Sequence, residues 1–354
     1  MITLGDPEQL TGGYLYHRRM ADAAPAHDAC VRFVSFPALP SLLPAVRARA
    51  LLGRACARGT DVVVLDSIAA AFVAPGLMLR PPPIPLVAIL HQPPGGIDHG
   101  RTRTAVQARL DRASYRRATA LILASAALAP RLPAALRART VVIPPGRDVA
   151  PPPAATGDMR RGRRAALLHV GNWVERKGLL DLLTAVAALP EDAATLHIAG
   201  RDDVERGYSA RVRARLAGPD LAGRVVVHGP LGPNRISALY HGADVFVLPS
   251  VREPYGTAYG EAMAAGLPVV GWRAGNLPHL AAHGQEGLVL PPGDVDALTA
   301  ALRRLADDEP YRRRLGRAAR RRAESLPTWD QSAAQLFATL RGIAGRSGVA
   351  APAG

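Results

Sequence analysis

The sequence predicts an α/β protein made of two Rossmann-like halves, each a parallel sheet with crossover helices. Short apolar runs alternate with helical patterns from one end of the chain to the other. The alternation stops once, at the Pro-rich and basic stretch 150–164 (APPPAATGDMRRGRR), and then begins again. At 354 residues the chain is also longer than a single core usually supports, so two domains are expected.

The first half carries apolar runs that we expect to be strands. They are rich in Val, Ile and Leu, as strands buried on both faces of a parallel sheet are. The expected strands are 2–4, 31–36, 61–65, 86–90, 120–124 and 141–143, and the expected helices are 14–23, 42–58, 68–73 and 101–118. Residues 1–150 are therefore the first predicted domain.

The second half repeats this alternation after a predicted linker at 151–164. The expected strands are 166–170, 195–199, 224–228, 245–248, 269–271 and 287–290, and the expected helices are 179–189, 208–217, 234–241 and 257–265, with another beginning at Asp294. Residues 165–326 are the second predicted domain. An amphipathic helix at 328–343 follows Pro327 and ends the pattern.

The segment Asp244 to Trp272 predicts a strand, a loop, a helix and a second strand. Two carboxylates lie in it, Glu253 in the loop and Glu261 about one turn into the helix. Carboxylates suit the vicinal hydroxyls of a sugar or ribose, and Gly256 with the first helical N–H groups suits an anion. Together they indicate a nucleotide sugar. The alternative is a solvated loop charge and a glutamate that the helix dipole favours.

Lys177 is the only lysine in the chain, beside 43 arginines. It lies in the loop Gly171 to Gly178, between a strand and a helix, where backbone N–H groups point at anions. A lysine presents a compact point charge, whereas arginine presents a wide planar fork. A tight pocket around a diphosphate could require the lysine. The alternative is a lysine left there by chance.

Two features of the first half point to the same edge of its sheet. Gly12–Gly13 precede a helix, and glycines at such a turn allow a ligand close to the backbone. His91 follows a predicted strand, at the carboxyl end where open α/β sheets bind ligands. A glycine pair or a single histidine is more often structural, so each is weak evidence by itself.

Many residues between 250 and 270 fit one motif with fixed spacing. They are Ser250, Glu253, Tyr255, Gly256, Glu261, Ala262, Ala264, Gly266, Pro268, Val269 and Val270. The pattern resembles the signature of family-4 retaining glycosyltransferases of GT-B fold. The resemblance implies two Rossmann-like domains that face each other across a cleft. It also implies an acceptor domain at 1–150, a donor domain at 165–326 and a terminal helix at 327–344 that crosses back to the first domain.

The resemblance also implies an activity and a set of site residues. The chain would move a sugar from a nucleotide-diphosphate sugar, UDP- or GDP-linked, to a glycan, lipid-linked or small-molecule acceptor, with retention of anomeric configuration. No metal and no further cofactor would be needed. The implied catalytic residues are Glu253, Lys177 and His91, and the implied donor-binding residues are Glu261, Gly256, Thr257, Tyr255, Asn172, Gly171, Gly12 and Gly13.

Two positions depart from the family's pattern. Asn172 stands where the family usually has an arginine, so one positive charge on the diphosphate is missing or comes from elsewhere. Arg252 and Arg201 are candidates for that charge. The family often shows Gly-Gly-x-Pro-Glu after the next strand, whereas this chain has Gly-Asn-Leu-Pro-His at 275–279.

Composition limits the partners and the compartment. The formal net charge is +15 at pH 7, which attracts phosphorylated substrates and anionic bilayers, although a general arginine bias explains it equally well. Cys30 and Cys56 fit no disulfide framework or zinc pattern. The start lacks a secretory signal pattern, and the most apolar window, 62–79, is broken by Asp66 and Pro75. We expect a cytoplasmic protein, with peripheral association at the inner face of the membrane as an option.

Other functions find less support. No Gly-x-Gly-x-x-Gly indicates a dinucleotide oxidoreductase, and no Gly-Lys-Ser/Thr indicates a P-loop nucleotidase. A phosphorylase would need a lysine that binds pyridoxal phosphate, and the only lysine of the chain, Lys177, is already placed in the predicted diphosphate loop. A nucleotide-sugar epimerase of the same fold stays open, as does a catalytically weak protein that binds anions or membranes. Nucleic acid is not expected as a partner. Asp294-Val-Asp296 spells a metal motif of another transferase fold, but Asp294 is better explained as a helix N-cap.

Overall fold

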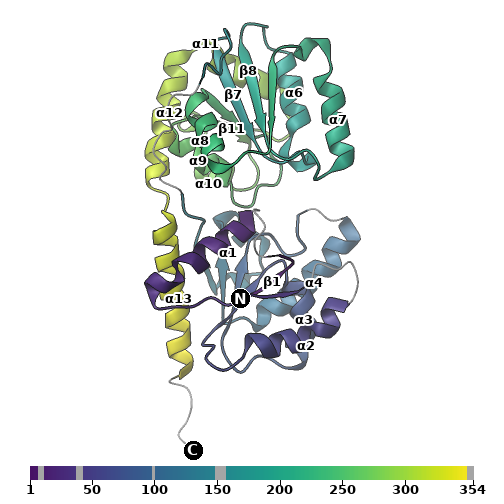
Figure 1. The fold of residues 1–354 in the computed structure, drawn as a ribbon, viewed down its shortest axis with the longest axis vertical. Coiled ribbons are helices and arrows are strands. Elements are labelled where there is room, and N and C mark those ends of the chain that lie inside the picture. The colour runs from purple at the N-terminus through teal and green to yellow at the C-terminus, as the bar shows by residue number, and fades with distance from the viewer. Residues whose placement is uncertain (7–11, 37–42, 98–99, 148–156, 349–354) are drawn as a thin grey trace, which may run out of the picture. The chain divides into compact units, whose positions relative to one another are not determined.

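The computed structural model of the chain describes residues 1–6, 12–36, 43–97, 100–147 and 157–348. The chain divides into two compact units (Figure 1). Unit 1 comprises Met1–Gly146 and Pro327–Gly354, and unit 2 comprises Arg147–Leu326. Each unit contains one six-stranded sheet in which every pair of neighbouring strands is parallel, so the predicted α/β architecture is confirmed.

The sheet of unit 1 has the strand order β2-β1-β3-β4-β5-β6. Its strands are β1 (Ile2–Leu4), β2 (Val34–Phe36), β3 (Val63–Asp66), β4 (Leu86–Leu90), β5 (Ala120–Leu123) and β6 (Thr140–Val142). The chain passes from β1 to β2 on one side and then returns to build β3 to β6 on the other. Its topological switch point therefore lies between β1 and β3, where open α/β sheets bind ligands.

Helices cover both faces of this sheet. They are α1 (Gly12–Ala23), α2 (Leu43–Ala55), α3 (Ala70–Leu79), α4 (Arg101–Arg117), α5 (Ala134–Arg137) and the 3-10 turns η1 (Ala24–His27) and η2 (Ala126–Arg131). The terminal helix α13 (Trp329–Gly348) packs against α1 and η1 (Figure 1). It buries Leu336 and Phe337 in a core shared with Tyr16 and Met20 of α1. The end of the chain is therefore part of unit 1.

Helix α3 is longer than the sequence predicts. The predicted helix ends at residue 73, two residues before Pro75, and an internal proline lacks an N–H group and usually breaks a helix. The helix instead continues through Pro75 to Leu79. It packs between α2 and α4, and a Cβ on Gly76 would come within 2.8 Å of Leu52 Cδ1. Tertiary packing of this apolar segment outweighs the cost of the proline.

The sheet of unit 2 has the order β12-β11-β10-β7-β8-β9. Its strands are β7 (Ala165–Val170), β8 (Ala194–Ala199), β9 (Val225–Gly229), β10 (Val245–Val247), β11 (Val269–Trp272) and β12 (Gly287–Leu290). This is the order of a Rossmann sheet, with the switch point between β7 and β10. The carboxyl ends of these two strands form the edge at which a ligand is expected.

The helices of unit 2 follow the predicted alternation. They are α6 (Leu179–Ala187), α7 (Arg206–Leu216), α8 (Pro233–Gly242), α9 (Thr257–Ala264), α10 (Leu277–Leu280), α11 (Val295–Asp307), α12 (Glu309–Glu324) and the 3-10 turns η3 (Glu175–Lys177) and η4 (Pro219–Leu221). Helix α9 is followed by Gly266 at φ +84°, the left-handed position that ends many helices. Asp294 caps α11, since its side chain accepts a hydrogen bond of 2.9 Å from the Ala297 N–H.

The predicted linker is packed at its second end. Its residues 151–156 lie outside the described part of the chain, whereas 157–164 belong to unit 2. Arg160 donates two hydrogen bonds, of 2.8 and 2.6 Å, to the carboxylate of Asp244. Asp244 also accepts a bond from Ala166 N at the start of β7. Arg160 therefore helps to stabilise the sheet of unit 2 through Asp244, a role that composition alone did not reveal.

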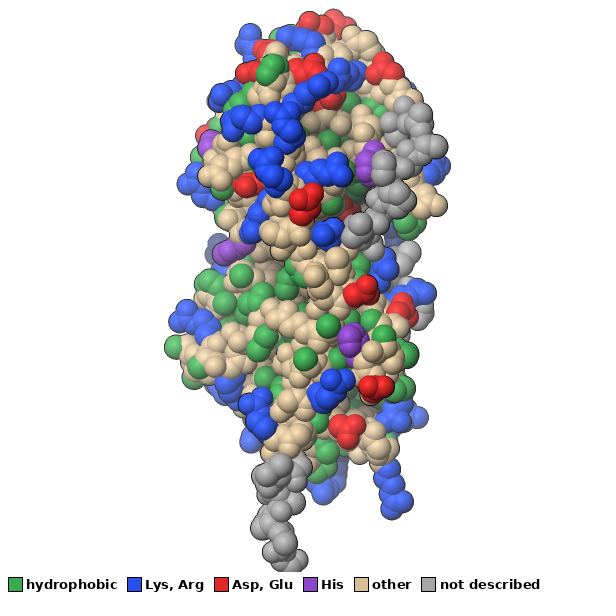
Figure 2. Space-filling model, turned by 90° about the vertical axis from the view of Figure 1, so that its left-hand side faces the viewer, with side chains coloured by type: hydrophobic (Ala, Val, Ile, Leu, Met, Phe, Trp, Pro, Cys, Tyr) green, Lys and Arg blue, Asp and Glu red, His purple; other side chains and the backbone are tan. Residues whose placement is uncertain are grey.

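The basic segment near the end of unit 2 forms α12. Figure 2 shows Lys and Arg side chains gathered on the face of unit 2 that carries this helix. Most of the helix's arginines are exposed, as a solvated face predicts, but Arg312 is 3% exposed and donates to the Leu305 carbonyl. Among the described residues, no helix is both long and apolar enough to cross a membrane.

Candidate active site

Two loops meet at the switch point of unit 2. The first, residues 171–178, follows β7, and the second, residues 248–256, follows β10. The two strands are direct neighbours, with Leu167 opposite Val245. Both loops leave the same edge of the sheet, so the switch point brings together two segments that lie far apart in the sequence.

Direct hydrogen bonds tie the loops together. The Arg176 carbonyl accepts bonds of 2.9 Å from Ser250 Oγ and from Val251 N, and the Arg176 guanidinium donates to the Arg252 carbonyl at 3.0 Å. Gly178 lies at φ +68°, and a Cβ there would come within 2.1 Å of the Pro249 oxygen. Glycine is therefore required at 178 for both its conformation and its contact.

Lys177 and Glu253, two of the predicted catalytic residues, contact each other. Lys177 Nζ donates a hydrogen bond to Glu253 Oε2. The side chains are 12% and 11% exposed, so most of the pair is shielded from water. Arg176 Nη1 lies 3.7 Å from the same oxygen. The site thus holds one carboxylate against two cations.

The turn after β11 fixes the backbone of Glu253. The Glu253 carbonyl accepts a hydrogen bond of 2.8 Å from Asn276 N, and the Asn276 side chain donates to the Tyr255 carbonyl at 2.6 Å. Gly275 lies at φ +57°, and a Cβ there would come within 2.5 Å of the Glu253 oxygen. The Gly-Asn pair that departs from the family's pattern therefore holds the loop that carries the predicted catalytic carboxylate.

Helix α9 begins at the same edge. Gly256 is its N-cap at φ +75°, and no side chain caps the helix, so its first N–H groups face outward from Thr257 onward. Glu261 is exposed one turn into the helix. Burial, and then the carboxylate of Glu261, raise the pKa of Tyr240 well above its ordinary value. Glu261 therefore lies close to the Tyr240 hydroxyl.

Pattern reasoning did not identify His169, the fifth residue of β7, as a site residue. His169 is fully buried, and its Nδ1 lies 3.1 Å from the Val247 carbonyl, so Nδ1 is the donor and Nε2 carries the lone pair. That Nε2 is buried without a hydrogen-bond partner. It lies 3.5 Å from the Cβ position of Gly171, beside the Lys177 stem. Burial, and then the Lys177 charge, lower the pKa of His169 to about 4.

One signal in the sequence could have pointed to His169. It is the single polar residue in the apolar run Ala-Ala-Leu-Leu-His-Val, close to the carboxyl end of the strand. Arg176 was also missed, because a loop arginine in so basic a chain carries no signal by itself. Both residues lie next to the Lys177–Glu253 pair, and neither could be placed there without the three-dimensional structure.

Asn172 is exposed at the start of the first loop. Its side-chain oxygen accepts a hydrogen bond of 3.2 Å from Arg201 N. The Arg201 guanidinium, one of the candidates for the missing charge, pairs with both oxygens of Asp203 at 2.9 Å. Arg252 contributes its carbonyl to the Arg176 guanidinium. Arg176 has a guanidinium nitrogen 3.7 Å from Glu253 Oε2, and the sequence did not single this arginine out.

In unit 1 the structure brings His91 and Gly13 together. His91 follows β4, and a Cβ on Gly13 would lie 3.6 Å from two atoms of its ring. Gly12 and Gly13 are the first residues of helix α1 itself, not a loop before it. His91 is only 4% exposed and contacts His17. Burial first, and then His17, lower its pKa to about 3, so the ring is neutral.

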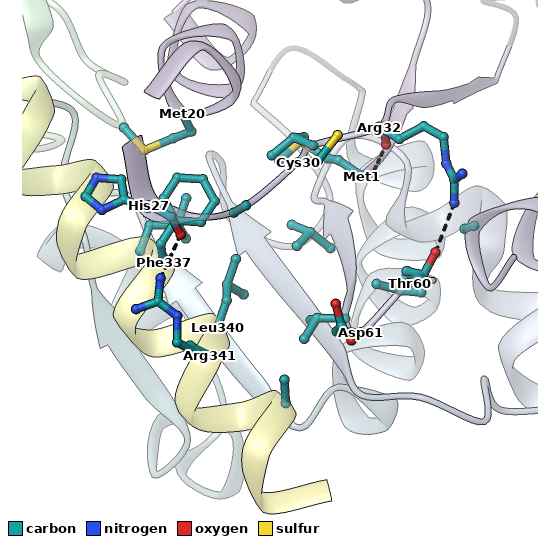
Figure 3. A pocket seen from close by; sticks show the side chains of 18 of the residues that line it. Met1, Met20, His27, Cys30, Arg32, Thr60, Asp61, Phe337, Leu340 and Arg341 are labelled. Carbon is teal, nitrogen blue, oxygen red and sulfur yellow. Dashed lines mark hydrogen bonds between the residues drawn. The ribbon is translucent and has the colours of Figure 1, made fainter. Parts of the chain in front are cut away.

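Unit 1 also contains a cavity of 610 Å³ next to α13 (Figure 3). Its apolar wall includes Met20, Phe337 and Leu340, and Arg341 donates to the His27 carbonyl at its rim. The cavity adjoins the amino ends of β1, β2 and β3. His91 and Asp66 lie at the carboxyl ends, so none of the predicted site residues lines this cavity.

Comparison with known proteins identifies the family. Residues 160–322 match the sequence profile described as Glycosyl transferases group 1. Glycogen synthase of Mycobacterium tuberculosis is 33% identical over 258 residues, which cover 70% of this chain and 60% of that protein. The GDP-mannose-dependent alpha-(1-6)-phosphatidylinositol monomannoside mannosyltransferase of the same species is 30% identical over 216 residues, 56% of this chain and 55% of that protein. The chain therefore spans somewhat more than half the length of these relatives.

A solved structure matches nearly the whole chain. Anabaena HepE in complex with UDP-glucose has a TM-score of 0.79 and 21% sequence identity, over 96% of this chain and 99% of that chain. This likeness confirms the predicted GT-B fold, with a Rossmann-like sheet in each unit. Residues 160–322 therefore form a domain of the glycosyl transferases group 1 family.

Proposed function

We propose that the chain is a retaining glycosyltransferase that moves a sugar from a nucleotide-diphosphate sugar to an acceptor hydroxyl. The observation that carries the proposal is the Lys177–Glu253 pair at the switch point of unit 2, beside the uncapped start of α9. A cation and backbone N–H groups suit a diphosphate, and a carboxylate suits sugar hydroxyls. The glycosyl transferases group 1 domain at residues 160–322 supports the same reaction class.

Donor binding exchanges partners within this pair. Lys177 Nζ turns from Glu253 to the diphosphate, and the carboxylate of Glu253 accepts hydrogen bonds from the sugar. Arg176, 3.7 Å from the same carboxylate oxygen, stays beside Glu253 and limits the cost of separating the pair. The Lys177 charge then faces the oxygen on which negative charge grows as the donor bond breaks. Removing such a donor costs about 10²–10³ in kcat.

The reaction balances without a general base. The bond from the anomeric carbon to the diphosphate oxygen breaks, and a bond to the acceptor oxygen forms on the same face of the sugar. The acceptor's proton goes to the leaving phosphate oxygen. Lys177 and the α9 N–H groups from Thr257 onward compensate the diphosphate charge, so this step needs no metal ion at the phosphates.

Glu261 is proposed to bind the ribose hydroxyls of the donor. It is exposed on α9 one turn from Gly256, within reach of a nucleotide whose phosphates lie at the helix start. UDP and GDP are the first bases to test, because the Anabaena protein holds UDP-glucose and one mycobacterial relative is named GDP-mannose-dependent. The acceptor is a glycan, a lipid-linked sugar or a small molecule, and the roles of His91, Gly12 and Gly13 stay predictions from the family resemblance.

A thermal-shift panel tests the donor site. It compares UDP, GDP, ADP, TDP and their sugars on the wild type, on Glu261→Ala, and on Glu191→Ala, which removes an exposed glutamate in the turn before β8. At 100 times Kd, a nucleotide should raise the melting temperature of a unit of this size by about 5–10 °C. The rise should persist in Glu191→Ala and disappear in Glu261→Ala.

No shift with any nucleotide would contradict the proposal and favour a protein that binds other anions. A shift without transfer to any acceptor would favour the epimerase alternative, which interconversion of the donor sugar would reveal. The anomeric configuration of a transferred sugar, read by NMR coupling constants, checks retention. An inverted product would overturn the same-face step while leaving the donor site intact.

A further inference from the structure

Three polar side chains converge at the switch point of the sheet in unit 1. Asp66 ends β3, His91 follows β4, and His17 reaches them from α1. One ligand atom from each lies within 4.8 Å of the other two. The three residues are 1%, 4% and 0% exposed, respectively. In the part of the chain that the structure describes, this is the one such group with metal-binding side chains.

Two polar contacts of this cluster share a single ring nitrogen, His17 Nε2. His17 Nε2 lies 2.9 Å from Asp66 Oδ2 and also 2.9 Å from His91 Nε2. A ring nitrogen donates one hydrogen or accepts with one lone pair. If it donates to Asp66, the same hydrogen must serve the His91 contact. If it accepts from His91, its lone pair faces a carboxylate oxygen.

The other neighbours of Asp66 orient its carboxylate. Thr3 Oγ1 on β1 donates to Oδ2 at 2.9 Å, and Ile68 N donates to Oδ1 at 3.2 Å. Metal-binding carboxylates are commonly held in this way. The His17 Nδ1 atom has no hydrogen-bond partner, so the polar contacts of this ring run through Nε2, which faces the other two groups.

We propose that His17 Nε2, His91 Nε2 and the Asp66 carboxylate bind a divalent first-row transition cation, for which Zn²⁺ is the probe. A tetrahedral zinc ion with bonds of ~2.0–2.1 Å holds its ligand atoms ~3.3 Å apart. The two observed separations of 2.9 Å need to open by only a few tenths of an ångström to admit it. The ion replaces the shared proton with one centre that all three lone pairs face.

The donor set selects the class of cation. Two imidazole nitrogens and one carboxylate oxygen favour zinc, iron, cobalt or nickel over magnesium and calcium, which prefer oxygen ligands. The cation also supplies positive charge to a carboxylate that is 1% exposed, a position that is costly without compensation. Three protein ligands leave a fourth position open.

The test uses the whole 354-residue chain, purified without a metal-affinity step. Metal content is measured by mass spectrometry, and chelator-treated protein is then titrated with Zn²⁺ and with Co²⁺, whose visible absorption reports the ligand field. We expect one ion per chain, a melting temperature higher by about 5 °C with excess Zn²⁺, and binding weakened at least ~100-fold in His17→Gln and in Asp66→Asn.

A second histidine pair in the chain provides the matched control. His197 Nδ1 and His228 Nε2 also lie 2.9 Å apart, but no carboxylate completes a ligand group there among the described residues. His228→Gln should therefore bind as much metal as the wild type. Binding that is lost in His228→Gln and kept in His17→Gln would place the ion elsewhere and overturn the proposal.

The wild-type titration decides the question even if the His17 and Asp66 variants fold poorly. Absence of tight Zn²⁺ and Co²⁺ binding by folded wild-type protein would overturn the proposal and leave the cluster as a shared-proton network around His91. The readouts are binding and absorption, so this test does not depend on whether the chain transfers sugars.

Discussion

Replacing Lys177 with methionine separates the two roles of the Lys177–Glu253 pair. Methionine keeps most of the apolar stem that passes Gly171, whose Cβ position lies 3.6 Å from Lys177 Cδ and Cε. The substitution removes only the charged tip, which donates to Glu253 Oε2. Glu253 then keeps Arg176, 3.7 Å away, as its nearby cation.

The expected loss of stability lies between two limits. Breaking a fully buried ion pair costs about 3–5 kcal/mol, whereas an exposed pair contributes about 0–1 kcal/mol. The side chains are 12% and 11% exposed and Arg176 remains, so we expect about 2 kcal/mol for the unfolding of unit 2. For a unit of this size, that corresponds to a melting temperature lower by about 4–8 °C.

The double variant Lys177→Met/Glu253→Gln is the informative control. Removing both charges leaves no buried carboxylate without its partner, so it should lose less than about 1 kcal/mol. Stability comes from urea unfolding followed by circular dichroism, and activity comes from nucleotide-sugar turnover. Both variants should lose at least ~10²-fold in kcat/KM, because neither can compensate the leaving diphosphate.

Equal destabilisation of the single and double variants would show that the Glu253 charge costs nothing once Lys177 is gone, and would refute the role assigned to the buried carboxylate. Full activity of Lys177→Met would refute the charge-compensation step while leaving the stability argument intact. Because Lys177 also contributes to the depressed pKa of His169, the same variant should raise that pKa from about 4. NMR titration of the ring measures this directly.

Three further predictions concern the fold. Burial raises the pKa of Asp111 to about 6, so its contribution to the stability of unit 1 is lost as pH rises from about 4 to 6. Asp111→Asn, which keeps an acceptor for Gly95 N, should be more stable than the wild type at pH 8 by up to ~3 kcal/mol and equal to it at pH ~3, below both pKa values, in urea titrations. Gly178→Ala should cost more stability than Gly223→Ala, because both lie at φ +68° but only the former approaches a neighbouring oxygen; equal losses in unfolding experiments would remove the argument from contact. Asp294→Ala should cost about 1 kcal/mol through loss of the α11 cap, more than Asp296→Ala, and a larger loss in Asp296→Ala would contradict the N-cap assignment.

The sequence predicts the sheets better than the boundaries of the helices. Apolar runs bounded by polar residues identify the strands, because burial on both faces of a parallel sheet leaves a continuous signal. Helix α3 is the clearest miss, since the rule against internal proline is local whereas the packing of Gly76 against Leu52 is tertiary. Another helix boundary lies at Asp308, between α11 and α12. The Asp308 side chain accepts a hydrogen bond from Tyr311 N and so caps α12.

The placement of Lys177 and Glu253 at one edge of the sheet follows from general rules. Each residue lies in the loop that follows a strand, and the switch-point rule brings those two loops together. The cluster of His17, Asp66 and His91 was not foreseen, because 74 positions separate the two histidines and no local pattern links them. His169 was not foreseen because a histidine inside a strand is ordinarily a core residue. Sequence patterns place residues at an edge, but contacts between side chains depend on helix placement.

The structure gives a stereochemical reason for a single lysine among 43 arginines. Arg176 already uses its planar guanidinium to reach the Arg252 carbonyl, and it lies 3.7 Å from Glu253. An arginine at 177 would bring five more N–H donors to a position that is 88% shielded from water and faces a single carboxylate. Most of those donors would lack acceptors, which is costly in a buried site. The compact ammonium group satisfies the carboxylate and can turn to an anion, so lysine fits position 177 for reasons that do not depend on the family resemblance.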